Sequence, residues 1–108
     1  MSEPAKIRQI NIDEARALHE AGECLFVDIR DAESHREARI AGAVPLGDAN
    51  FQEFLKETPR GKPLVVYCYH GNSSMAATQV LMDKGFTDVV SMAGGFEEWA
   101  LFHPYEEE

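Results

Sequence analysis

The sequence has few cysteines, no long apolar run and no clustered metal ligands. Its two cysteines, Cys24 and Cys68, form no Cys-x-x-Cys pair, so neither a disulfide framework nor a zinc ribbon is supported. No apolar stretch approaches the roughly 20 residues of a membrane span, and no signal-peptide core follows residues 1–6. The four histidines are scattered. We therefore expect a cytoplasmic protein without a metal or cofactor.

Basic residues are also in short supply. The chain carries 19 acidic against 10 basic residues, which gives a formal net charge of −9. This excess opposes attraction to nucleic acid or to an anionic membrane, so neither partner is expected. The 108 residues are 44% hydrophobic, enough to bury one ordinary core, and we expect one domain over residues 1–108.

Strand and helix patterns alternate along the chain. Strands are expected at residues 7–10, 24–29 and 88–92, in the apolar run before Cys68, and as a short or edge strand within 40–46. Helices are expected at residues 12–21 and 32–38, from Asn50 to Thr58, after the Cys68 loop as far as Gly85, and after Gly94-Gly95. This order predicts an α/β domain of three layers, with a central parallel sheet flanked by helices.

Capping residues and aromatic residues give finer expectations. Asn11 with Glu14, and Asn50 with Glu53, have the spacing of a capping box. The tail at residues 106–108 is expected to be frayed. The last helix is expected to pack three aromatic residues in the core: Phe96, Trp99 and Phe102.

Cys68 ends an apolar strand and precedes a tight loop and a helix. Ligands of such sheets bind beyond the carboxyl ends of the strands, and the free amides of a helix N-terminus favour a thiolate. Gly71 and Asn72 adopt left-handed backbone conformations easily, so the loop can turn its N–H groups inward as an anion nest. We predict that Cys68 is the catalytic nucleophile and that the substrate is bound by Tyr69, His70, Gly71, Asn72 and Ser73.

Several neighbours of Cys68 have simpler interpretations. Ser73 and Ser74 are good helix N-caps, although either hydroxyl could touch a donor. The backbone N–H of His70 is the part of that residue that the nest requires. Asp28 and Arg30 end a neighbouring strand and are interpreted as a structural ion pair that braces the loop.

A thiolate in such a loop also suits a cysteine phosphatase or an arsenate reductase. Phosphoryl transfer calls for a bidentate arginine, yet no arginine follows Arg60, and Lys84 falls at the far end of the next helix. A sulfane sulfur is smaller and less charged, so backbone donors suffice for it. Sulfur transfer is therefore favoured, with weak binding of a dianionic donor, on the order of millimolar or poorer.

Three segments of the chain resemble the single-domain rhodaneses, and the likeness spans nearly its whole length. Residues 27–31 resemble the family's strand-ending signature, residues 68–74 its active-site loop, and residues 94–99 its closing motif. The resemblance implies a rhodanese fold and thiosulfate sulfurtransferase activity through a Cys68 persulfide, with cyanide or a dithiol such as thioredoxin as acceptor. A relay or docking module without turnover is the alternative. Residues 38–41 lack the family's Gly-His-Ile, so no role of that histidine is carried over.

Overall fold

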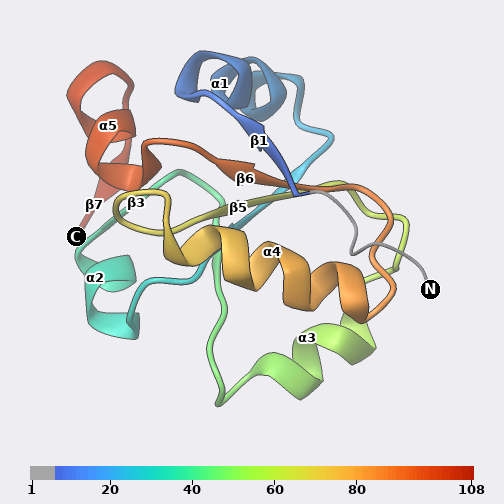
Figure 1. The fold of residues 1–108 in the computed structure, drawn as a ribbon. Helices are drawn as coiled ribbons and strands as arrows, with labels where there is room; N and C mark the ends of the chain where they lie inside the picture. Colours follow the sequence, from blue (N-terminus) through green and yellow to red (C-terminus); the bar gives the residue numbers. More distant parts are fainter. Residues whose placement is uncertain (1–6) are drawn as a thin grey trace.

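The structure, a computed structural model, describes residues 7–108 and places a parallel sheet between two layers of helices (Figure 1). Residues 1–6, where no signal segment was expected, lie outside the described residues. The strands are β1 (Arg8–Ile10), β2 (Leu25–Asp28), β3 (Ala38–Arg39), β4 (Val44–Pro45), β5 (Leu64–Tyr67), β6 (Val89–Met92) and β7 (Glu106–Glu107). The helices are α1 (Ile12–Ala21), α2 (Ala32–Glu37), α3 (Phe51–Glu57), α4 (Ser73–Asp83) and α5 (Gly95–Phe102).

The main sheet has the strand order β1-β6-β5-β2-β4, and every neighbouring pair is parallel. This arrangement confirms the predicted three-layer α/β fold. β5 is the central strand, and β4 is the short edge strand that the sequence predicts. Since all five strands run the same way, their carboxyl ends meet at one edge of the sheet, which is where such folds bind ligands.

Each face of the sheet has its own apolar core, because successive side chains of a strand point to opposite faces. Phe26, Val65 and Tyr67 pack on the side of α1 and α5, where Trp99 is 1% exposed. Val27, Leu64 and Val66 pack on the side of α3 and α4. Figure 1 shows α1 and α5 above the sheet, with α4 and α3 below it. The strands therefore read as continuous apolar runs, the pattern typical of a sheet covered on both faces.

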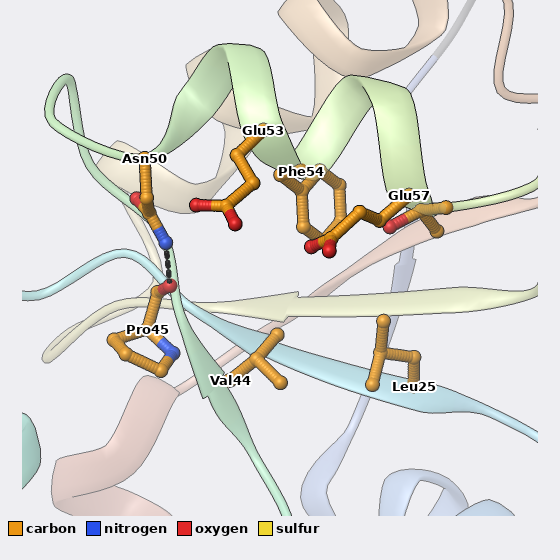
Figure 2. Close-up of a pocket in the computed structure, with 8 residues that line it drawn as sticks. Leu25, Val44, Pro45, Asn50, Glu53, Phe54 and Glu57 are labelled. Atoms are coloured by element: carbon orange, nitrogen blue, oxygen red, sulfur yellow. Dashed lines mark hydrogen bonds between the residues drawn. The ribbon is translucent and has the colours of Figure 1, made fainter.

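One predicted capping box forms and the other does not. At the start of α1, Asn11 Oδ1 accepts the Glu14 N–H (2.8 Å) and Glu14 Oε1 accepts the Asn11 N–H (3.0 Å), which confirms the box. The box predicted for α3 is wrong. Asn50 instead uses both ends of its side chain on the preceding turn. Its Oδ1 accepts the Gly47 N–H at 2.8 Å. Its Nδ2 donates to Pro45 O, also at 2.8 Å (Figure 2).

The C-terminal segment corrects two expectations. The tail is not frayed, because β7 pairs antiparallel with β3 and the Glu108 N–H donates to Glu37 O (3.0 Å). Phe102 is not in the core and is 68% exposed. Three-residue steps fall about 60° short of a full helical turn each, so a residue two steps beyond Phe96 has left the buried face.

Within residues 7–108, no helix has the length and apolar character needed to cross a membrane. The same residues contain no group of three or more histidine, cysteine or acidic side chains placed to hold a metal ion. Both cysteines are free thiols.

Candidate active site

Cys68 lies directly after β5, at the carboxyl end of the central strand, where the sequence places it. Residues 69–72 form the loop that joins it to α4. Gly71 has φ +99°, the left-handed conformation expected of a glycine in a nest. Cys68 is buried and retains 6% of its surface exposed. Cys68 therefore sits in a largely dry site.

Two backbone N–H groups and one hydroxyl converge on the Cys68 sulfur. The N–H groups of Gly71 and Ser74 donate to Sγ at 3.0 and 3.3 Å, and the Ser74 Oγ lies 3.5 Å from it. Burial alone would raise the pKa of the Cys68 thiol. Hydrogen bonds from the Ser74 hydroxyl and from the amides of Ser74, Gly71 and His70 outweigh burial and hold that pKa below its usual value. The site therefore favours the thiolate, the reactive form of cysteine.

The predicted loop residues divide into two groups. Gly71 donates its N–H to the sulfur, and the His70 amide contributes to lowering the pKa of Cys68. The side chains of Tyr69 and His70 face solvent: Tyr69 is 49% exposed, and His70 Nδ1 lies 3.1 Å from the exposed Glu97 carboxylate. Asn72 and Ser73 are exposed as well. Within residues 7–108, the loop holds the free thiol through its main chain.

Ser74 was interpreted from the sequence as a helix cap, but in the structure it lies within the first turn of α4. It is the second residue of α4 and fully buried, and its free N–H points at the sulfur instead of being capped. Its Oγ lies 2.8 Å from the Oγ of Ser91, also fully buried, in β6. Sequence reasoning missed Ser91, although a serine within the apolar run of residues 89–92 is a signal that could have found it.

The start of α5 fixes the orientation of the Cys68 loop. The N–H groups of Phe96 and Glu97, free because they begin a helix, donate to the carbonyls of Cys68 (2.8 Å) and Tyr69 (2.9 Å). Gly95 allows this approach, since a Cβ on it would lie 2.4 Å from Tyr69 O. With these carbonyls held on the α5 side, the amides that follow are free to turn toward the sulfur. The glycine pair of the predicted closing motif thus positions the site.

Asp28 and Arg30 form the buried ion pair that the sequence predicts. Arg30 Nη2 donates to Asp28 Oδ2 (2.7 Å) and to Ala38 O (2.6 Å), while His35 Nδ1 lies 2.8 Å from the same carboxylate oxygen. Burial would raise the pKa of Asp28, but the hydrogen bonds with Arg30 and His35 outweigh it and lower that pKa. The guanidinium also lies 4.2 Å from the centre of the Phe96 ring. The pair therefore braces the residue whose N–H holds the Cys68 carbonyl.

Among residues 7–108, no cation supports the sulfur directly. The groups there that hydrogen-bond to Cys68 Sγ are backbone amides and one hydroxyl, with no arginine or lysine. Dispersed backbone donors suit a single sulfur atom better than the charged oxygens of a phosphoryl group. This geometry disfavours the phosphatase alternative on the same ground as the sequence.

A separate groove, shown in Figure 2, takes no part in the site. It runs between α3 and the edge of the sheet at β2 and β4. Glu53 and Glu57 of α3 line it, together with Leu25 at the beginning of β2. Neither Cys68 nor any residue of its loop contributes to the lining.

Comparison with known proteins identifies relatives over most of the chain. Residues 11–101 match the model of the rhodanese-like domain family. A protein of Coxiella burnetii named thiosulfate sulfurtransferase GlpE is 41% identical over 97 residues, which cover 90% of this chain and 91% of that protein. The protein of the same name from Pseudomonas syringae is 42% identical over 101 residues, 94% of each. The solution structure of a rhodanese-like domain from Anabaena sp. covers 99% of this chain and 81% of its own, with a TM-score of 0.83 at 22% identity, and so shares the fold.

Proposed function

The chain belongs to the rhodanese-like family and acts as a thiosulfate sulfurtransferase, and we propose that Cys68 carries the transferred sulfur as a persulfide. The observation that carries this proposal is the convergence of the Gly71 and Ser74 N–H groups on the Cys68 sulfur at the N-terminus of α4. Amides that stabilise a thiolate can equally stabilise the terminal sulfur anion of a persulfide.

The first half of the reaction transfers sulfur to the enzyme. The Cys68 thiolate attacks the outer sulfur of thiosulfate, a new S–S bond forms, and the S–S bond within thiosulfate breaks. Sulfite leaves with the electron pair of the broken bond, and Cys68 becomes a persulfide anion. The thiolate and thiosulfate together carry a charge of minus three, and so do the persulfide anion and sulfite. The step therefore needs no proton. The loop amides from Tyr69 to Ser73 form the proposed substrate-binding cradle, with the Gly71 N–H already turned toward the sulfur.

The second half returns Cys68 to the thiolate. A thiophilic acceptor attacks the outer sulfur of the persulfide and the S–S bond breaks toward Cys68. Cyanide leaves as thiocyanate, and a dithiol such as thioredoxin would carry the sulfur onward. A reducing compartment suits this chemistry because both thiols of the chain are free, so a cytoplasmic location forms part of the proposal, as does a single domain over residues 1–108.

A steady-state assay tests the proposal. Thiosulfate and cyanide are supplied together and thiocyanate is measured for the wild type, Cys68→Ser and Cys24→Ser. We expect turnover in the wild type and in Cys24→Ser, none in Cys68→Ser, and half-saturation at thiosulfate concentrations on the order of millimolar. The protein is acidic, and no cation among residues 7–108 hydrogen-bonds to the sulfur.

Two outcomes would redirect the proposal. Turnover that survives in Cys68→Ser and is lost in Cys24→Ser would move the nucleophile to Cys24. Cys24 is half-buried, and burial together with the nearby Asp88 and Glu23 raises the pKa of its thiol, which makes it the poorer candidate. Persulfide formation with negligible thiocyanate release would indicate a relay module instead of a complete enzyme.

A further inference from the structure

We propose that Ser91 is a positioning residue for sulfur transfer: when Cys68 is ionised, the buried Ser91 hydroxyl donates to Ser74 Oγ and so directs the Ser74 proton to the Cys68 sulfur. This inference rests on the proposed function and extends the site from the loop to the neighbouring strand. In this proposal the Ser74 side chain is catalytic because it contacts the sulfur, and Ser91 acts only through Ser74.

The fold brings the three side chains together on one face of the sheet. Ser91 lies in β6 opposite Val66 of β5. Cys68 lies two residues after Val66 in the chain. Since alternate residues share a face, Cys68 lies on the same side as Val66, the side that α4 covers. Ser74, in the first turn of α4, therefore stands between Cys68 and Ser91. The distances are 3.5 Å from Cys68 Sγ to Ser74 Oγ and 2.8 Å from Ser74 Oγ to Ser91 Oγ.

Proton counting shows which direction this chain of hydroxyl groups favours. A serine hydroxyl has one proton to donate. When Cys68 is ionised, Ser74 donates to the sulfur and Ser91 donates to Ser74, so each proton has an acceptor. In the reverse direction the thiol donates to Ser74 and Ser74 donates to Ser91. The Ser91 proton is then left without an acceptor among residues 7–108, since Ser74 Oγ is the partner of Ser91 Oγ there.

The reverse arrangement is costly because both serines are fully buried. A buried donor without an acceptor loses the hydrogen bond that water would have given it. The pair therefore favours the anionic forms of Cys68, both thiolate and persulfide. It supplies from neutral side chains part of the stabilisation that a guanidinium would provide in a phosphatase loop.

The test measures the ionisation of Cys68 without any sulfur donor. In a Cys24→Ser background, the rate constant for alkylation by iodoacetamide is recorded against pH for the parent, Ser91→Ala and Ser74→Ala. We expect Ser91→Ala to lower the rate at pH 7 by roughly three- to tenfold, as the loss of one indirect hydrogen bond predicts, and to move the profile to higher pH. The rate reached at high pH should remain that of the parent. In the Ser74→Ala background, adding Ser91→Ala should change nothing further.

Thr78→Val is the matched control. Thr78 is also fully buried in α4, and its hydroxyl donates to the backbone oxygen of Ser74 (2.7 Å). That hydroxyl is not part of the hydrogen-bonded series formed by Cys68 Sγ, Ser74 Oγ and Ser91 Oγ. Its removal should alter stability while leaving the pH midpoint of alkylation unchanged. Ser91→Thr keeps the hydroxyl and should keep the parent profile, which also covers the case in which Ser91→Ala does not fold.

The outcomes separate this inference from the proposed function. An unchanged midpoint in Ser91→Ala, an effect that persists when Ser74 is alanine, or a shifted profile in Ser91→Thr would each overturn the role of Ser91. None of these results depends on thiosulfate, so they leave the persulfide proposal standing. Conversely, a protein that shows the Ser91 effect but forms no persulfide would contradict the proposed function alone.

Discussion

Among glycine-to-alanine substitutions in this fold, Gly95→Ala should disrupt the site most. A Cβ at this position would lie 2.4 Å from Tyr69 O, 2.5 Å from Tyr69 C and 2.8 Å from Cys68 O. Each of these atoms is backbone, so none can move aside as a flexible side chain would. The loop must therefore separate from the start of α5.

The expected cost follows from two contributions. Gly95 has φ +62°, and placing an alanine in that left-handed conformation costs about 1–2 kcal/mol. Separation of the segments also breaks the hydrogen bonds from Phe96 and Glu97 to the loop carbonyls, at about 1 kcal/mol each. Together they predict a decrease of about 3–4 kcal/mol in the free energy of unfolding. The amides of the loop would lose their orientation, so alkylation of Cys68 at neutral pH should slow as well.

Urea unfolding of Gly95→Ala and Gly22→Ala, side by side, separates the contributions. Gly22 ends α1 with φ +74° and has no atom within 4 Å of the position that a Cβ would take. Gly22→Ala should therefore show the conformational cost alone, about 1–2 kcal/mol, and normal alkylation of Cys68. If the two variants lost the same stability and Gly95→Ala kept the parent alkylation rate, the close approach of α5 would not be what holds the site.

Three further predictions follow from the buried and exposed charges. Asp28→Asn leaves Arg30 buried without its counter-charge and should lower the free energy of unfolding by about 3–5 kcal/mol in urea titrations. Because the pKa of Asp28 is depressed in the folded state, its contribution is complete above the unfolded pKa near 4 and is lost as pH falls below it, so the difference from Asp28→Asn should shrink in acid. Because the pKa of Cys68 is also depressed, its alkylation at neutral pH, in a Cys24→Ser background, should be faster in the folded protein than in urea, and should slow as pH falls. Glu106→Gln removes an ion pair with Arg39 in which Glu106 is mostly exposed, and should change stability by less than about 1 kcal/mol.

The parts of the site that could be predicted from the sequence are those set by neighbours in the chain. Cys68 lies between an apolar strand and a helix, and that order alone predicts a cysteine at a helix N-terminus. Asn11 and Glu14 cap their helix because both partners are three residues apart. Gly71 adopts the left-handed conformation that the loop requires. In each case the interaction is local, so the residue types and their spacing are sufficient to predict it.

The remaining features depend on contacts between distant segments. Ser91 meets Ser74 only because β6 lies beside β5 in one register and α4 packs against them, and a single sequence does not contain that register. Asn50 has the residue type and spacing of a helix cap, but its side chain hydrogen-bonds to Gly47 and Pro45 in the preceding turn instead. The C-terminal strand β7 was missed because its pairing partner, β3, is nearly 70 residues earlier in the chain.

The most direct test of the account is the intact mass of the protein after incubation with thiosulfate alone. With Cys68 as the carrier, the wild type and Cys24→Ser should each gain the mass of one sulfur atom, and cyanide should remove it. Cys68→Ser should gain nothing. A sulfur adduct that persists in Cys68→Ser, or its absence from a wild-type protein that still produces thiocyanate, would contradict the persulfide mechanism.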